Sequence, residues 1–207
     1  MAKYASKVVT QAKAWLGKKE SDGSFKVIID TYNSQKPLPV GYKVKYTDDW
    51  CATFVSAVAV KLGYTDIIPT ECSCERMIAL FKKMGCYIEG NKVIPEAGWV
   101  IFYDWQNNGR SDHVGFVEKV SGGQNHVIEG NKGEAVARRY IKTDSKYIMG
   151  YGVPKYDKAT TTKKSVDAIA KEVIAGKWGS GEERKKKLTA AGYDYTEVQA
   201  VVNKLLK

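Results

Sequence analysis

The chain has 207 residues, 43% of them hydrophobic, and a net charge of +10. This length allows one mid-sized catalytic domain together with a small module, and the apolar content excludes a mainly disordered chain. The charge favours a polyanionic partner, either nucleic acid or an anionic cell wall. No nucleic-acid motif accompanies it and no apolar run could span a bilayer, so we expect neither nucleic-acid binding nor membrane insertion.

The first half of the chain has the pattern of a helical region. Helices are expected at residues 5–16 and 24–33, from near residues 48–51 to the stop at Gly63, and at residues 75–84. The third of these begins near Cys51, is apolar on nearly every side and stops at Gly63, which is typical of a buried helix. Asp48 or Asp49 is expected to cap its N-terminus by accepting backbone N–H bonds.

Beyond Gly90 the pattern changes to short apolar runs separated by turn residues, which indicates strands. Strands are expected at residues 99–103, 113–120, 126–129, 136–141 and 148–153. A glycine-containing turn at residues 121–125 joins the second and third strands into a hairpin. Helices followed by an antiparallel sheet predict an α+β domain over residues 1–155.

The tail differs in composition from the rest of the chain. A polar stretch without periodicity at residues 156–164 predicts a linker. Three short helices, separated by glycines, are expected to follow it within residues 165–207. So short a segment predicts a small three-helix bundle and is too small for a second catalytic core.

The cysteines divide into two groups. Cys51 is expected at a helix N-terminus, where the helix dipole and free N–H groups stabilise a thiolate. A single cysteine at such a place is more often a small buried hydrophobe, so the position alone does not establish a nucleophile. We expect Cys72, Cys74 and Cys86 to be reduced structural thiols, because the C-x-C spacing is too tight for a usual zinc site.

Strand periodicity brings a histidine toward a carboxylate. Residues two apart share a face of a strand, so Glu129 and Asn131 point together and His126 points the other way. If the hairpin pairs in register, His113 faces the side of Glu129 and Asn131. Together with Cys51 these residues supply a nucleophile, a base and an orienting group.

Four segments resemble the successive motifs of the CHAP family, the cysteine, histidine-dependent amidohydrolases/peptidases. They are residues 50–55, 100–105, 112–117 and 127–131. The resemblance extends over roughly the first 155 residues and implies a papain-like CHAP domain of the α+β class. It further implies that Cys51 is the nucleophile, His113 the general base and then acid, Glu129 the orienting third member and Asn131 a fourth polar catalytic position.

The chain departs from this family ahead of the cysteine. Some members carry an Asp-rich calcium loop there, whereas Tyr42–Tyr46 holds two lysines and no carboxylate. We therefore expect no metal ion and no cofactor. The backbone N–H of Cys51 is the expected oxyanion donor, with the Tyr46 hydroxyl as a second donor.

The tail is similar to the cell-wall-binding repeat at the C-terminus of some phage lysozymes, through its Gly-Lys-Trp-Gly and Ala-Gly-Tyr-Asp sequences. The resemblance implies binding of a muropeptide by Arg184, Asp194, Tyr193 and Tyr195. An arginine can pair with a stem-peptide carboxylate and exposed rings can stack on sugars. We expect Trp178 to lie in the core of the bundle.

These two resemblances together imply a bacteriolytic phage endolysin that hydrolyses an amide bond of peptidoglycan through a Cys51 thioester. Cleavage between muramic acid and L-alanine is favoured, which makes the protein an amidase. An endopeptidase that cuts the stem peptide or cross-bridge, an inactive wall-binding protein and an intracellular protease stay open as alternatives. The N-terminus carries no secretory pattern. We therefore expect synthesis in the cytoplasm of the host bacterium and action at the cell wall after release.

Overall fold

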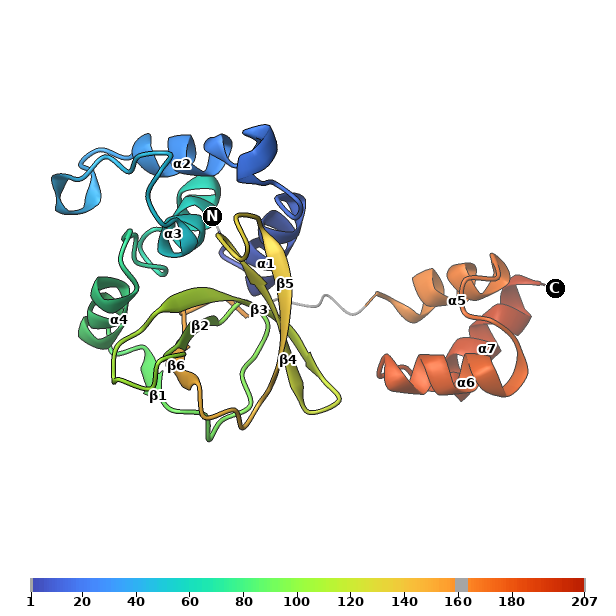
Figure 1. The fold of residues 1–207 in the computed structure, drawn as a ribbon. Helices are drawn as coiled ribbons and strands as arrows, with labels where there is room; N and C mark the ends of the chain where they lie inside the picture. The colour runs from blue at the N-terminus through green and yellow to red at the C-terminus, as the bar shows by residue number, and fades with distance from the viewer. Residues whose placement is uncertain (1, 159–163, 207) are drawn as a thin grey trace. The chain divides into compact units, whose positions relative to one another are not determined.

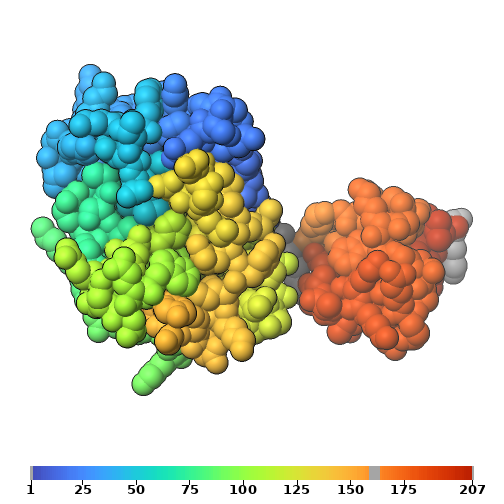
Figure 2. Space-filling model, in the orientation of Figure 1, coloured from blue at the N-terminus to red at the C-terminus, as the bar shows by residue number. Residues whose placement is uncertain are grey.

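A computed structural model of the protein describes residues 2–158 and 164–206. The chain divides into two compact units, residues 1–158 and residues 159–207, which we call the larger and the smaller unit. Figure 2 shows the larger unit in blue to light orange and the smaller unit in orange to red. Most of the predicted linker, residues 159–163, lies outside the described residues.

The larger unit combines four α-helices with one antiparallel sheet in the described chain. The helices are α1 (Ala5–Ala14), α2 (Lys26–Asn33), α3 (Cys51–Leu62) and α4 (Cys74–Lys83). The strands are β1 (Tyr87–Glu89), β2 (Val100–Tyr103), β3 (His113–Ser121), β4 (Gln124–Glu129), β5 (Ala137–Lys142) and β6 (Ile148–Gly152). Their order across the sheet is β1-β6-β2-β3-β4-β5. The predicted α+β class is therefore confirmed.

Both faces of the sheet are covered by apolar side chains. One face packs against the helices, with α3 lying on β3, and contributes Phe102 and Phe116 to the main core. The other face forms a second cluster around Tyr103, Val127 and Tyr151. Figure 1 shows the strands curving around this second side while α1 and α3 lie against the first. Side chains that alternate along one strand therefore reach two separate environments.

Helix α3 is the buried centre of the larger unit, as its sequence predicts. All but its last three residues are buried, and Gly63 ends it in the left-handed conformation at φ 67°. The predicted cap by Asp48 or Asp49 is wrong, because among the described residues no side chain caps this helix. Asp48 instead accepts from the backbone N–H of Lys45. Asp49 accepts a hydrogen bond from the side chain of Asn131, which lies just beyond β4.

The β3–β4 hairpin has the register that strand periodicity predicts at the end that holds His113 and Glu129. Gly115 lies opposite Glu129, and the strands turn at Gly122 and Gly123, both with positive φ. A two-residue turn with both central residues at positive φ fits the twist of the flanking strands. The pairing shifts between Val117 and Lys119, far enough along the hairpin to leave the Gly115–Glu129 pairing in place.

Strand β1 was not predicted from the sequence. It has three residues and pairs only with β6, at one edge of the sheet. So short a run is too brief to show a period of two residues. The other strands and the four helices lie within a few residues of their predicted positions.

The smaller unit contains three short helices in its described residues: α5 (Val166–Ile174), α6 (Gly181–Ala190) and α7 (Tyr195–Leu205). Their core consists of Ile169, Ala170, Val173, Leu188, Val198 and Val202. Side-chain caps begin two of the helices, since Ser165 accepts from Ala168 N–H and Asp194 from Glu197 N–H. Across the described parts of both units, we find no helix with the length and apolar character needed to cross a membrane.

Candidate active site

Cys51 is the first residue of α3 and is 8% exposed. Its sulfur lies 3.6 Å from the sulfur of Cys74, within hydrogen-bonding distance, and the Cys74 thiol and the nearby His113 imidazole both lower the pKa of the Cys51 thiol. No side chain caps α3 within the described chain, and the backbone N–H of Ala52 in its first turn interacts with the Cys51 sulfur. The position is therefore suited to a negatively charged sulfur or oxygen.

His113 lies between the sulfur and a buried carboxylate. Its Nε2 atom is 3.1 Å from Oε2 of Glu129, and its interactions with both Cys51 and Glu129 raise the pKa of the ring. Glu129 is fully buried and the His113 side chain is only 13% exposed. The ring of Tyr103 stacks on the imidazole at a centroid distance of 6.1 Å. The three predicted residues Cys51, His113 and Glu129 thus form one continuous chain of contacts.

Arg139 is a fourth member of this arrangement, and the sequence motifs do not include it. Its Nε–H donates to both oxygens of Glu129, at 2.7 and 2.9 Å. Its guanidinium group lies 4.6 Å from the centre of the Trp105 ring and 5.6 Å from that of Tyr103. Glu129 therefore receives hydrogen bonds from two cationic partners, and its position is fixed from two directions.

The pKa values in this cluster favour separated charges on the sulfur and the imidazole. The hydrogen bond from Cys74 lowers the pKa of Cys51, and the hydrogen bond and charge of His113 lower it further against the opposing effect of burial. Burial lowers the pKa of His113, but hydrogen bonds to Cys51 and Glu129 outweigh this and raise it to about 9. At neutral pH the pair is accordingly a thiolate and an imidazolium.

The carboxylate of Glu129 stays ionised for a similar reason. Burial raises its pKa, but the hydrogen bonds and charges of His113 and Arg139 outweigh burial and hold the pKa below its ordinary range. An ionised carboxylate beside Nε2 stabilises the imidazolium and fixes the orientation of the ring.

Two glycines allow the strands to approach closely enough to build the site. A Cβ atom at Gly115 would come within 2.7 Å of Glu129 Cγ, so only glycine leaves room for that side chain over β3. A Cβ atom at Gly130 would lie 2.3 Å from the Cβ of Phe54 on α3. The end of β4 therefore rests directly on the helix that carries Cys51.

Asn131 does not join His113 in the described structure, although the resemblance assigned it a catalytic position. It lies beyond the end of β4 with φ 53°, and its Nδ2 donates to Oδ1 of Asp49 at 3.0 Å. This bond connects the segment after β4 to the segment before α3. A catalytic role for Asn131 stays a prediction.

Tyr46 and His126 are both engaged elsewhere. The Tyr46 hydroxyl donates to Asp30 at 2.7 Å, so its proton is not directed at the sulfur and the predicted second oxyanion donor is not formed in this structure. His126 packs edge-on against Tyr140 at a centroid distance of 4.9 Å. As strand periodicity predicts, His126 points away from Glu129.

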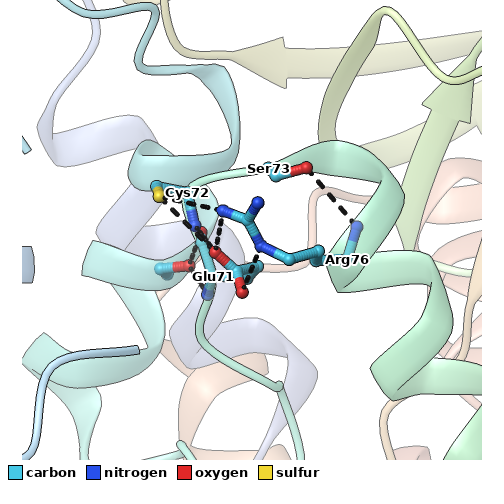
Figure 3. A network of polar contacts seen from close by, with 5 residues as sticks. Glu71, Cys72, Ser73 and Arg76 are labelled. Atoms are coloured by element: carbon cyan, nitrogen blue, oxygen red, sulfur yellow. Dashed lines mark hydrogen bonds and ion pairs between the residues drawn. The ribbon is translucent and has the colours of Figure 1, made fainter. Parts of the chain in front are cut away.

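The segment before α4 is held by a polar network around Glu71 (Figure 3). Arg76 Nη2 donates to Oε1 of Glu71, and Arg76 Nε lies close to Oε2, each at 2.9 Å. The backbone N–H of Cys72 also donates to Glu71 at 2.7 Å, and Ser73 caps α4 by accepting from Arg76 N–H. These bonds fix the start of α4, where Cys74 is the first residue.

The four cysteines, all in the described residues, are free thiols. The Cys72 thiol bonds to the Glu71 carboxylate and the Cys86 thiol to the Met84 carbonyl, whereas Cys74 contacts Cys51. The contact between Cys51 and Cys74 was not anticipated from the C-x-C spacing. Among the described residues, no group of three or more His, Cys, Asp or Glu side chains is placed to hold a metal ion.

The four predicted wall-binding residues all make contacts within the smaller unit. Arg184 donates from Nε to Gly179 O at 3.0 Å and from Nη1 to Gln199 Oε1 at 3.2 Å. Asp194 caps α7, and Tyr193 and Tyr195 pack against the core. Trp178 also packs there, with its ring edge-on to Tyr193. A binding role for these residues stays a prediction.

Comparisons with known proteins match each unit to a different family. Residues 41–131 match the CHAP domain, and residues 167–206 match the CW_7 repeat. A stretch of 44 residues is 51% identical to a lysozyme of Streptococcus phage Cp-7, which is 21% of this chain and 13% of that protein. The chain thus spans only a small part of this curated relative.

Two solved structures are similar at low sequence identity. The crystal structure of Ly7917 aligns with 14% identity and a TM-score of 0.45, covering 72% of this chain and 62% of that one. The structure of Ly7917 with the hydrolyzing product of MDP aligns with 13% identity and a TM-score of 0.41, covering 73% and 63%.

Proposed function

Since the chain combines a CHAP domain with a CW_7 repeat, we propose that it is a peptidoglycan hydrolase that cleaves an amide bond with Cys51 as the nucleophile. The observation that carries this proposal is the contact chain from the Cys51 sulfur through the His113 ring to the buried carboxylate of Glu129. A nucleophile, a base and an orienting acid in mutual contact are the parts that acyl transfer requires.

The proposed reaction starts from the thiolate and imidazolium pair. The Cys51 sulfur attacks the amide carbonyl, and the oxygen that becomes negative accepts a hydrogen bond from the Cys51 backbone N–H at the start of α3. One such donor is typically worth ~3 kcal/mol in the transition state. His113 then protonates the leaving amine, which leaves an acyl thioester on Cys51. His113 next accepts a proton from water as the water attacks the thioester, and the free acid leaves.

Glu129 and Arg139 take part without touching the substrate. Glu129 stabilises the positive charge that His113 carries and fixes the orientation of the ring through Nε2. Arg139 fixes Glu129 in turn. Replacing Glu129 with glutamine keeps the shape of the side chain and removes its charge. We therefore expect Glu129→Gln to lower kcat strongly and to change KM little.

We propose further that the bond cut is the one between muramic acid and L-alanine, and that the CW_7 repeat holds the muropeptide with Arg184, Asp194, Tyr193 and Tyr195. The repeat adds a wall-binding unit to the catalytic unit, which raises the local concentration of enzyme at the polymer. The net charge of +10 acts in the same direction at an anionic wall.

The test is digestion of purified sacculi followed by mass spectrometry of the new ends. An amidase frees the amino group of L-alanine, whereas a new D-glutamyl or D-alanyl end would indicate an endopeptidase. Cys51→Ala and His113→Ala should each abolish release while binding to sacculi persists. Release by Cys51→Ala at the wild-type rate would remove the proposed mechanism. Cleavage of casein without cleavage of sacculi would indicate a protease instead.

A further inference from the structure

We infer that Cys74 is a positioning residue for the proposed nucleophile, because its S–H group donates a hydrogen bond to the sulfur of Cys51 and stabilises the thiolate. The two sulfur atoms are 3.6 Å apart and both side chains are buried. The inference rests on the proposed role of Cys51. It assigns a function to a thiol that the C-x-C motif gave no reason to place in the site.

The direction of this hydrogen bond follows from the surroundings of the two thiols. Each cysteine is the first residue of a helix, so both receive a similar field from a helix dipole. Only Cys51 has the cationic His113 ring beside it. Cys74 is instead followed by Glu75. The hydrogen bond with Cys51, burial, and the negative charges of Cys51 and Glu75 raise the pKa of Cys74. Cys51 therefore loses its proton and Cys74 keeps one to donate.

The separation of the two sulfurs is fixed by the junction between α3 and α4. Ser56, one of the buried residues of α3, donates to the carbonyl of Glu71 at 2.6 Å and accepts from the Glu71 N–H at 2.8 Å. Both bonds are buried, and Glu71 is also held by Arg76 (Figure 3). The start of α4 is therefore tied to α3 a few residues before Cys74. A thiol on a mobile loop would not keep this contact.

The burial of Cys51 explains why a second donor is needed. A buried thiolate has little access to water, and burial by itself raises the pKa of a thiol. In this site the three groups that offset burial are His113, the Ala52 backbone N–H and the Cys74 thiol. Removal of the Cys74 donor should therefore raise the pKa of Cys51, even though His113 and Glu129 keep their positions.

The experiment measures how the alkylation rate of Cys51 by iodoacetamide depends on pH, read by mass spectrometry of the Cys51 peptide in the full chain. The variants are Cys74→Ala and Cys74→Val, which lose the donor, and Cys74→Ser, which keeps a donor of similar size. Cys86→Ala is the matched control, since the Cys86 thiol bonds to the Met84 carbonyl and not to Cys51. Thermal denaturation of each variant shows that it is folded.

We expect the alanine and valine variants to raise the midpoint of Cys51 alkylation by about one pH unit, which is roughly tenfold less thiolate below the midpoint. The serine variant should shift it by much less, and the Cys86→Ala control not at all. The inference is overturned if the midpoint stays at its wild-type value in the alanine and valine variants. It is also overturned if serine shifts it as far as valine, because the effect would then follow packing and not donation.

This experiment separates the inference from the proposed function. Alkylation of Cys51 requires no peptidoglycan, so the midpoint shift is measurable even if sacculi are not the substrate. Conversely, suppose that activity depends on Cys51 while the midpoint of Cys51 alkylation does not change when Cys74 is replaced. That result would support the proposed function and overturn this inference.

Discussion

Arg138 and Arg139 are neighbours on β5 that serve two different glutamates, and this makes them a matched pair for testing how Glu129 is held. Arg139 donates to Glu129, which is fully buried, and its own side chain is 27% exposed. Arg138 pairs with Glu118, whose side chain also contacts Lys13. We expect Arg139→Met to destabilise the protein much more than Arg138→Met.

The magnitude follows from what each substitution leaves behind. Arg139→Met leaves the buried Glu129 carboxylate with His113 as its remaining cationic partner, and breaking a buried pair from one side costs about 3 kcal/mol. Arg138→Met breaks a pair whose arginine side chain is 38% exposed and whose glutamate is 8% exposed. Lys13 stays beside Glu118, so the cost should be only about 1 kcal/mol. In a unit of this size 1 kcal/mol corresponds to about 2–4 °C in Tm. We therefore expect a loss of about 6–12 °C for Arg139→Met and of at most about 4 °C for Arg138→Met.

The assay is thermal denaturation of both variants and of wild type, monitored by circular dichroism at neutral and at acid pH. The pKa of Glu129 is held low in the folded protein, so the stability it contributes is present above its unfolded pKa and lost as the pH falls through the folded pKa. The difference between Arg139→Met and wild type should accordingly narrow in acid. Equal losses for the two arginine variants, or a difference that does not change with pH, would refute this reasoning.

Three further predictions concern the site itself. Gly115→Ala should lower sacculus clearing at least tenfold in a folded protein, because the added Cβ would meet Glu129 Cγ at 2.7 Å; clearing at the wild-type rate would contradict this. The pH profile of kcat/KM should fall on its alkaline side near the His113 pKa of about 9; an alkaline limb near pH 6.5 would contradict this. The folding stability that His113 contributes should be complete below pH 6.5 and lost as the pH rises through about 9. Hydrogen peroxide should convert the Cys51 thiolate to a sulfenic acid that condenses with the Cys74 thiol to a disulfide and water. Dithiothreitol should then restore activity to wild type. In Cys74→Ala no thiol traps the sulfenic acid, so excess peroxide should oxidise it to a sulfinic acid that dithiothreitol does not reduce; equal recovery would contradict the pairing.

The residues that the sequence could identify are those whose geometry is local. The place of Cys51 at a helix start follows from local sequence, and the shared face of His113 and Glu129 follows from the period of two residues along a hairpin with a short turn. Their catalytic roles rest on the resemblance to the CHAP family. Arg139 could not be found this way. Arg138 and Arg139 are adjacent on β5 and point to opposite faces of the sheet, and the sequence alone does not say which face Glu129 shares. Only the pairing of β4 with β5 decides which arginine reaches Glu129.

Cys74 and the α3 cap show the same limit. The contact between Cys51 and Cys74 depends on how α3 and α4 meet, and that junction is set by Ser56 and Glu71, fifteen residues apart in sequence. Asp48 and Asp49 precede α3 as caps usually do, but bonds to Lys45 and Asn131 take their carboxylates away from the helix. Local propensity predicted the element correctly and the polar contact wrongly, because tertiary partners compete for the same side chain.

His113 carries a proton because the Cys51 sulfur and the Glu129 carboxylate are beside it. Since the chain has only two histidines, an NMR titration of their ring protons measures this directly, with His126→Gln to assign the signals. We predict that His113 titrates near pH 9 in the wild type and at a clearly lower pH in Cys51→Ala. A His113 midpoint that is the same with and without the Cys51 sulfur would contradict the account.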